Sequence, residues 1–118
     1  MNTIMDAKQK LKCPVTQTLN IVGGKWKALI LFQLTQSHMR TGELERNLPG
    51  ITQKMLIQQL RELEQDGLVL RKVYAEVPPR VEYSLTELGL SFLPVLKAMA
   101  DWGHAYRQRN LVPEREAI

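Results

Sequence analysis

The sequence has little of what disulfide-bonded, metal-binding or covalent catalytic proteins need. Cys13 is its one cysteine, which excludes a disulfide within the chain, and His38 and His104 are its only histidines. These residues do not have the spacing of a zinc site, and they offer no pair that would act as nucleophile and base. A glycine-rich phosphate loop and a Gly-x-Ser-x-Gly elbow are also missing. The sequence therefore gives no support to an enzyme, a metal centre or a cofactor site.

Long apolar runs are missing as well. No N-terminal stretch resembles a signal peptide, and none approaches the roughly 20 apolar residues that a membrane span needs. We therefore expect a cytoplasmic protein that has no membrane partner. At 118 residues, of which 44% are hydrophobic, the chain has the length of one domain. We expect residues 1–118 to form a single domain in which polar residues 1–12 are a flexible arm.

Charge of one sign dominates only part of the chain. The formal net charge is +4. Residues 1–60 hold eight Lys or Arg and three Asp or Glu, whereas residues 61–118 hold eight and nine. A basic surface favours a polyanionic partner, so the charge distribution indicates nucleic acid.

The most informative stretch is residues 41–66, TGELERNLPGITQKMLIQQLRELEQD, in which a Pro-Gly turn separates two helical patterns. Thr41 is the expected N-cap of the first helix and Thr52 that of the second. Gly67 is placed to end the second helix. A short helix, a tight turn and a second helix make a helix-turn-helix.

The second of these helices has two distinct faces. Leu56, Leu60 and Leu63 follow the i, i+4, i+7 spacing of a buried stripe. The opposite face carries amides and cations, which are the groups that bind base edges in a major groove. The predicted DNA contacts here are Thr52, Gln53, Lys54, Gln58 and Arg61. The alternative is a polar face that is simply solvated, as on most surface helices.

Two β patterns, residues 68–74 and 80–85, follow directly and are joined by a segment that ends in two prolines. A hairpin immediately after a helix-turn-helix is the wing of a winged helix. Its predicted contacts with phosphates or a minor groove are Arg71, Lys72 and Arg80. The alternative is that these cations protect edge strands from aggregation. The residues expected to alternate toward the core are Val69, Val73, Val81, Tyr83 and Leu85.

Helices are also predicted on the N-terminal side, over residues 14–22 and 25–36. The first has Val15, Leu19 and Val22 on one face. The second is expected to bury Trp26, Leu29, Ile30, Phe32 and Leu34.

A final helix is predicted from Thr86 to about Arg109, with Pro94 either kinking it or marking its start. Its apolar residues are too numerous to pack on one small domain, and they form two stripes. The first consists of Phe92, Leu96, Met99, Gly103 and Tyr106, and the second of Leu88, Val95 and Trp102. One stripe can pack on the domain and the other needs a partner, unless the core is larger than we expect. The predicted dimer interface is Leu88, Val95, Trp102 and Tyr106.

The fold class that follows is mainly α with a small β-hairpin, a winged helix-turn-helix with N- and C-terminal dimerisation helices. Over about residues 13–106 the chain resembles the HxlR family of winged-helix transcriptional regulators, which are relatives of the MarR proteins. The blocks that carry the resemblance, in order, are Cys13-Pro14, Gly23-Gly24-Lys25-Trp26, Leu48-Pro49-Gly50-Ile51-Thr52, Leu60-Arg61-Glu62-Leu63-Glu64, Gly67-Leu68-Val69, the run from Pro78 to Thr86, and Trp102.

The resemblance implies a sequence-specific DNA-binding homodimer. Two recognition helices would enter successive major grooves of a near-palindromic operator, while the wings contact the flanking backbone. Many members of the family are repressors, so we expect a repressor. Two alternatives remain open: a winged-helix module that binds another protein, and a regulator switched by a small molecule near Trp26, Trp102 and Tyr106 at the dimer interface.

The resemblance also makes Cys13 a candidate switch, because in several relatives a cysteine before this same proline senses oxidants or electrophiles. Lys10 and Lys12 are close in sequence, and a helix N-terminus stabilises a thiolate. The alternative is an unreactive cysteine that packs as a small hydrophobe. With one cysteine in the chain, a disulfide would join two subunits or form with a small thiol, or an electrophile would alkylate the thiol.

Overall fold

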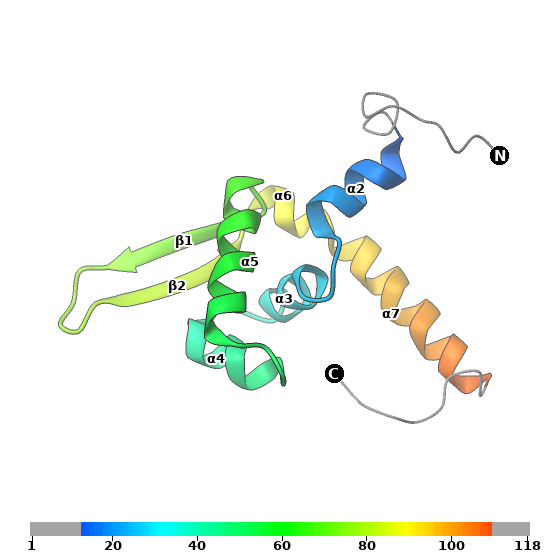
Figure 1. The fold of residues 1–118 in the computed structure, drawn as a ribbon. Helices are drawn as coiled ribbons and strands as arrows, with labels where there is room; N and C mark the ends of the chain where they lie inside the picture. The colour runs from blue at the N-terminus through cyan, green and yellow to red at the C-terminus, as the bar shows by residue number, and fades with distance from the viewer. Residues whose placement is uncertain (1–12, 110–118) are drawn as a thin grey trace.

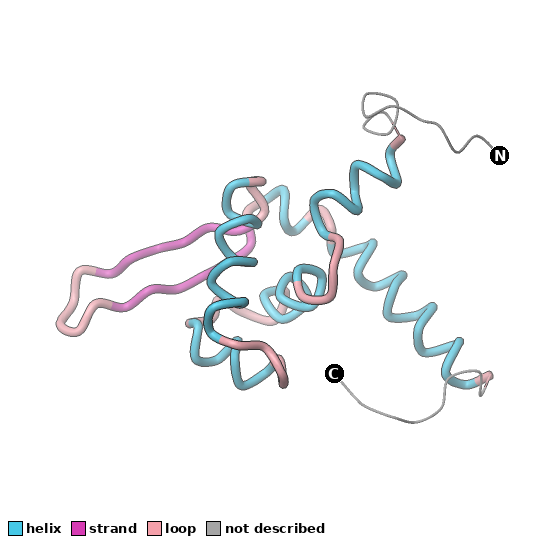
Figure 2. Tube along the Cα trace, viewed as in Figure 1, coloured by secondary structure: helices cyan, strands magenta, loops and turns pink. Residues whose placement is uncertain are grey.

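The computed structural model describes residues 13–109, so the arm predicted over residues 1–12 lies outside the described residues. The described part is mainly helical with one β-hairpin, which confirms the predicted class of a mainly α fold with a small β-hairpin (Figures 1 and 2). In chain order the elements are α2 (Pro14–Val22), α3 (Lys27–Leu34), α4 (Thr41–Asn47), α5 (Gln53–Gln65), β1 (Val69–Tyr74), β2 (Arg80–Leu85), α6 (Glu87–Leu90) and α7 (Leu93–Gln108).

Helices α4 and α5 form the predicted helix-turn-helix, and local signals set the limits of α5. The Thr52 hydroxyl accepts a hydrogen bond from the Met55 N–H at 3.1 Å, which confirms the predicted N-cap. At the other end Gly67 has a φ of 83°, a left-handed conformation that suits glycine. The chain reverses there, and the Leu68 N–H donates to the Leu63 carbonyl at 2.9 Å.

The start of α4 differs from the prediction by one residue. Arg40, not Thr41, holds the N-cap position, and its N–H donates to Glu43 Oε1 at 3.0 Å. Thr41 is already the first helical residue. The carboxylate of Glu43 satisfies the N–H of the N-cap residue from within the first turn, so the predicted N-cap was wrong although the helix itself was right.

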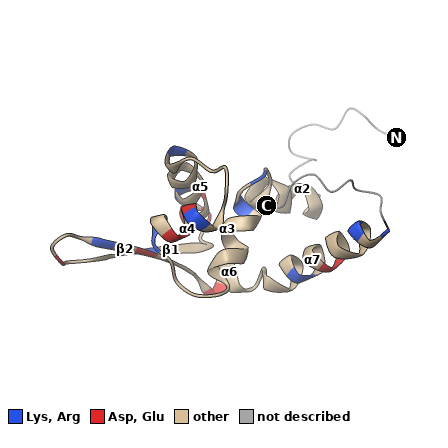
Figure 3. Cartoon of the chain, turned by 90° about the horizontal axis from the view of Figure 1, so that it is seen from below, with Lys and Arg blue, Asp and Glu red and all other residues tan. Residues whose placement is uncertain are grey.

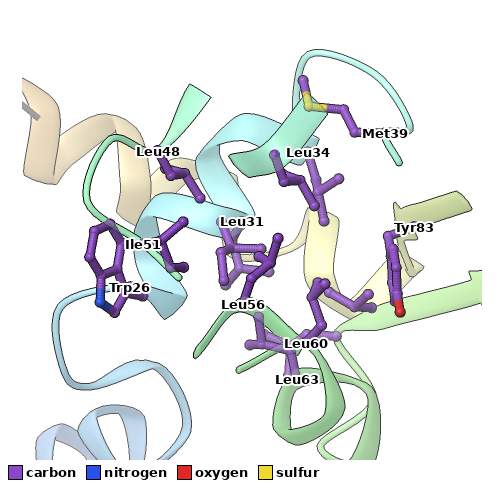
Figure 4. Packing of buried hydrophobic residues seen from close by; sticks show 14 of the residues in the cluster. Trp26, Leu31, Leu34, Met39, Leu48, Ile51, Leu56, Leu60, Leu63 and Tyr83 are labelled. Atoms are coloured by element: carbon purple, nitrogen blue, oxygen red, sulfur yellow. The ribbon is translucent and has the colours of Figure 1, made fainter. Parts of the chain in front are cut away.

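The core lies between α3 and α5. Leu56, Leu60 and Leu63 are fully buried, which confirms the predicted leucine stripe (Figure 4). Helix α3 presents Ile30 and Leu31, both fully buried, to the same core. Other buried members of the same core include Trp26, Leu34, Met39, Leu48 and Ile51.

Helix α3 is shorter than predicted, and the sequence pattern misplaced part of its buried face. Leu31 is fully buried although it was not among the expected core residues, and Leu29 is only half-buried. Phe32, which was expected in the core, is exposed by 39%. Apolar residues occupy almost every position of α3, so hydrophobicity alone does not tell which side faces the core.

Strands β1 and β2 pair antiparallel, from Val69 opposite Leu85 to Tyr74 opposite Arg80. The base of the hairpin is fixed to the domain, because Met39 and Tyr83 exchange two backbone hydrogen bonds of 2.9 and 2.8 Å. The hairpin then extends away from the helices (Figure 1). Val73 is exposed by 52% because no core lies beneath that part of the wing, so the prediction that it faces the core was wrong.

The predicted C-terminal helix is two helices, α6 and α7. The Thr86 hydroxyl accepts from the Gly89 N–H at 3.0 Å, as expected of an N-cap. Helix α6 ends at Leu90 and α7 begins at Leu93, with Pro94 in its first turn. Proline has no N–H to donate to a preceding turn, so it starts α7 instead of continuing α6.

Helix α7 projects from the domain, and only its first turns pack on it (Figure 1). Leu96 is buried, but Met99 is exposed by 52% and Gly103 is exposed too, so the first predicted stripe does not pack on the domain as a whole. On α2, Val15 and Leu19 are exposed as well. None of the described helices is long and apolar enough to cross a membrane.

Candidate nucleic-acid interface

The outer face of α5 presents the residues that the sequence assigned to DNA. All five are exposed: Thr52, Gln53, Lys54, Gln58 and Arg61. The buried leucine stripe fixes the rotation of α5, so its amides and cations face away from the core. Lys and Arg also lie on the neighbouring α4 and on the hairpin (Figure 3). The arrangement is that of a helix free to enter a groove beside a protruding wing.

One of these side chains is tied to a network that the sequence did not reveal. Gln58 Nε2 donates to Glu62 Oε2 at 2.6 Å, and Lys27 Nζ lies 2.6 Å from Glu62 Oε1. The Lys27 side chain is only 10% exposed, although its charge is normally at the surface. The i, i+4 spacing of Gln58 and Glu62 was a readable signal, but α3 and α5 had to be packed together before Lys27 could be paired with Glu62.

The network also fixes the charge of its central carboxylate. The hydrogen bond from Lys27, then that from Gln58, and then the positive charge of Lys27 lower the pKa of Glu62 below its usual range. Glu62 is therefore ionised at neutral pH. It holds the Lys27 cation of α3 with one oxygen and the Gln58 amide on the outer face of α5 with the other.

The wing places its first two cations on different sides. Arg71 lies opposite Tyr83 and Lys72 lies opposite Glu82 in the antiparallel register. Successive residues of a strand point to opposite faces, so the structure does not bring Arg71 and Lys72 together. Both side chains are exposed.

Arg80 is held within the wing by its neighbours. Its guanidinium lies 3.0 Å from Glu76 and 3.4 Å from Glu82, and it stacks 3.9 Å from the centroid of the Tyr74 ring. Lys72 Nζ lies 4.8 Å from the centroid of that ring. The carboxylates of Glu76 and Glu82 offset the charge of Arg80, so Arg80 holds the shape of the wing. Lys72 is more exposed than Arg80.

Two arginines that the sequence analysis did not single out lie at the N-cap and in the last turn of α4, the first helix of the helix-turn-helix. Arg40 and Arg46 are exposed at the two ends of α4, and with Thr41, Gly42 and Glu43 they line a shallow hollow of about 430 Å³. The first helix of a helix-turn-helix crosses the DNA backbone, where arginine binds phosphate. Their positions at the ends of the first helix were the signal that could have found them.

Cys13 occupies the N-cap position of α2, directly before Pro14, and it is partly exposed. Interaction with the backbone N–H of Thr16, then with the Thr16 hydroxyl and then with the Val15 N–H lowers the pKa of the Cys13 thiol. A lowered pKa raises the fraction of thiolate, which is the nucleophilic form. Lys10 and Lys12 lie outside the described residues.

The residues predicted for a dimer interface present apolar surface to solvent in the protomer. Leu88, Val95 and Trp102 are exposed by 57%, 43% and 69%. Tyr106 is half-buried and stacks on Trp102, with ring centroids 5.1 Å apart. Val95, Met99, Trp102 and Tyr106 are spaced i, i+4, i+7, i+11, so together they form one face of α7.

A hollow of about 420 Å³ lies between α3 and the first turns of α7. It is lined by Phe32, Thr35, Gln36, Leu93, Lys97, Ala100 and Asp101. The aromatic residues suggested for an effector pocket do not line it: Trp26 is buried in the core, and Trp102 and Tyr106 stack further along α7.

The sequence of this chain is similar to a known protein family and to individual regulators. The family described as HxlR-like helix-turn-helix matches residues 21–111. The helix-turn-helix-type transcriptional regulator YdeP of Bacillus subtilis (strain 168) is 53% identical over 97 residues, which are 82% of this chain and 76% of YdeP. These relatives are transcriptional regulators and not enzymes.

Two redox-related solved structures are similar to this one. The redox regulator HypR in its reduced form has a TM-score of 0.77 and 49% identity, covering 80% of this chain and 93% of HypR. The reduced form of the transcriptional regulator YodB from B. subtilis has a TM-score of 0.68 and 37% identity, covering 76% of this chain and 89% of YodB. HypR is also solved in its oxidised form, and YodB after treatment with diamide.

Proposed function

The chain belongs to the HxlR-like helix-turn-helix family of transcriptional regulators, and on this basis we propose that it is a homodimeric repressor which binds a near-palindromic operator and is switched at Cys13. The observation that carries the proposal is the polar face of α5, which three fully buried leucines hold outward beside the wing. A helix of this kind fits a major groove, where amides and guanidinium groups distinguish base pairs.

Within the proposed complex the described residues divide into two roles. Gln58 and Arg61 read bases, because glutamine binds adenine and arginine binds guanine in a bidentate manner. Arg40, Arg46 and Lys72 bind phosphates, which gives affinity but little sequence preference. The division gives each group its own expected response to mutation.

Dimerisation supplies the second recognition helix. The exposed apolar surfaces of α2 and α7 support a partner there, because a monomer rarely leaves so many large apolar side chains in water along one helix. A second copy related by a twofold axis buries the same surface of both subunits. Half-sites are then expected about one helical turn apart, or a multiple of one turn.

The proposed signal acts through the thiolate of Cys13. An oxidant such as diamide takes two electrons from two thiols, either those of two subunits or one Cys13 and a small thiol, and a disulfide results. Cys13 caps α2, a helix that carries part of the exposed apolar surface. Modification at this position is expected to shift α2 at the dimer interface, to move the two α5 helices out of register and to release DNA.

The proposal is tested by fluorescence anisotropy with a duplex from the intergenic region beside the protein's own gene and a random duplex at the same salt concentration. A preference of about a thousandfold or more for the first supports the proposal. Affinity is also expected to fall steeply with salt, because bound phosphates release counterions. Binding to neither duplex at any salt concentration would favour the alternative of a protein-binding module.

Replacing Gln58 with alanine is expected to weaken binding to the operator by about 1–3 kcal/mol and to relax the base preference at one position. Lys72→Ala is expected to weaken binding to operator and random duplexes alike. It should also reduce the salt dependence of the affinity by about one released counterion. Gln65→Ala is the matched control, because the same side chain is removed from the exposed C-terminal end of α5. Equal losses of Gln58→Ala on operator and random DNA would show that the reading face is wrongly assigned.

Replacing Cys13 with serine is expected to leave operator binding unchanged in reducing buffer. The variant should also keep binding the operator after diamide treatment, whereas the wild type should release it. The wild-type thiol should also react with iodoacetamide at a pH lower than an ordinary cysteine requires, because its pKa is lowered. The rate as a function of pH, followed by mass spectrometry, checks this. If Cys13→Ser releases DNA in diamide as the wild type does, Cys13 is not the switch.

A further inference from the structure

The Lys27–Glu62–Gln58 network extends from the core to the DNA-facing side of α5. Glu62 uses one carboxylate oxygen for Lys27 and the other for Gln58, each at 2.6 Å. Lys27 is buried in α3, whereas Gln58 is exposed on α5. A side chain placed to read bases is thus held by a carboxylate that is itself held by a nearly buried cation.

The chemistry of the contact fixes the orientation of the Gln58 amide. An ionised carboxylate can only accept hydrogen bonds, so the Gln58 atom facing Glu62 must be the nitrogen and not the oxygen. The charge of Glu62 is secured by Lys27, whose hydrogen bond lowers the pKa of the carboxyl group. The amide nitrogen has two hydrogens, and one is now used. Among residues 13–109 the other hydrogen and Oε1 have no protein partner.

This leaves Gln58 with one donor and one acceptor to offer to DNA. Adenine presents N7 as an acceptor and N6 as a donor in the major groove, which matches that pair. Guanine presents two acceptors, N7 and O6, and would need both hydrogens of an unrestrained amide. With one hydrogen committed to Glu62, Oε1 would face a guanine acceptor without a proton between them.

We propose that Glu62, anchored by Lys27, is a positioning residue that makes Gln58 select adenine over guanine. Glu62 itself need not touch DNA, since it acts by withholding one hydrogen of the Gln58 amide. The inference rests on the proposed DNA-binding function and adds to it the determinant of one base preference.

The test is selection of bound duplexes from a randomised library, followed by sequencing, with folding of each variant checked by thermal melting. The wild type is expected to select adenine at the base pair in each half-site that becomes degenerate in Gln58→Ala. Glu62→Ala should lower the adenine-to-guanine ratio at that base pair by about tenfold and leave the other positions unchanged. In the Gln58→Ala background, adding Glu62→Ala should not change the base preference further, because the two residues act as a unit.

Two controls separate positioning from charge and from stability. Glu64→Ala removes the same charge from an exposed position of the same helix, so it should raise affinity for all duplexes without altering the ratio. Lys27→Met combined with Glu62→Gln removes both charges but keeps an amide oxygen that can accept from Gln58. Because the introduced amide can also donate a hydrogen bond to Gln58 Oε1, it no longer fixes the Gln58 orientation, and this double variant should lose part of the preference for adenine.

The possible outcomes distinguish failure of the proposed function from failure of the role proposed for Glu62. A wild-type protein that selects no motif at all contradicts the proposed function and this inference together. A clear wild-type motif whose adenine-to-guanine ratio stays within twofold in Glu62→Ala overturns this inference alone. The inference is also overturned if Glu62→Ala and Glu64→Ala change the motif in the same way, or if the position sensitive to Gln58 does not favour adenine.

Discussion

Replacing Trp102 with aspartate is expected to yield a folded monomer that binds the operator about a hundredfold or more weakly than the wild type. Trp102 is exposed by 69% in the protomer, and it lies on the face of α7 formed with Val95, Met99 and Tyr106. A carboxylate on that face would be desolvated when a second copy packs against it. The apolar side chains around it could not compensate for the lost hydration. Since the protomer does not bury Trp102, its own fold should persist.

The expected effect on DNA binding is large because the proposed dimer binds two half-sites together. Once one α5 helix is in its groove, the second binds at a high effective concentration, and this advantage is lost when the subunits separate. Each monomer then has only one recognition helix and one wing. Weak salt-dependent binding to phosphates should remain, because Lys72, Arg40 and Arg46 are unchanged.

Sedimentation velocity at micromolar concentration and anisotropy with the operator check the two parts of this expectation. Leu70→Asp is the matched control for assembly: Leu70 is exposed by 53%, but it lies on the wing. It should leave the sedimentation coefficient unchanged. A Trp102→Asp variant that sediments as the wild type does would place the dimer interface elsewhere.

The parts of the fold that could be predicted are those whose signals are local. The N-cap Thr52, the C-terminal glycine Gly67 and the leucine spacing between them all lie within sixteen residues, and together they define α5. The position of the wing followed from strand patterns directly after that helix. These signals do not depend on which distant elements pack together.

The errors arose where tertiary packing decides. Val73 has the spacing of a core residue, but the hairpin extends beyond the domain at that point. Met99 belongs to an apolar stripe, but it is exposed by 52%, and the α7 residues that line the hollow against α3 include its neighbours Ala100 and Asp101 and not Met99. In both cases the periodicity of the sequence correctly gave the face and could not give what covers it.

The candidate site shows the same division. The exposed residues of α5 could be assigned from helical spacing, whereas the pairing of Lys27 with Glu62 joins positions 35 residues apart and depends on how α3 packs. The two carboxylates that pair with Arg80 also required the hairpin geometry, since Arg80 and Glu76 lie on either side of the turn. Sequence therefore predicts which side chains of α5 are exposed better than it predicts which of them are already paired within the protein.

Replacing Leu60 with alanine is expected to lower the free energy of unfolding by about 2–5 kcal/mol, the range for removing a fully buried leucine. Leu60 has no exposed surface and lies in the middle of the stripe that packs α5 in the core with Ile30 and Leu31 of α3. The cavity left behind loses packing on all sides, because these neighbours are fixed by their own helices. For a domain whose total stability is about 5–15 kcal/mol, this is a large fraction.

Urea unfolding followed by circular dichroism, at one fixed protein concentration because a dimer is expected, measures the change. Leu70→Ala removes the same atoms from an exposed position of β1 and should change stability by no more than about 0.5 kcal/mol.

The leucine stripe also sets the rotation of α5, so Leu60→Ala tests the function as well as the fold. In the folded fraction of the variant, base preference should be retained if Leu56 and Leu63 still hold the reading face outward. A variant as stable as Leu70→Ala would mean that α5 is not held by this stripe, and the orientation of its DNA-facing residues would then lose its physical basis.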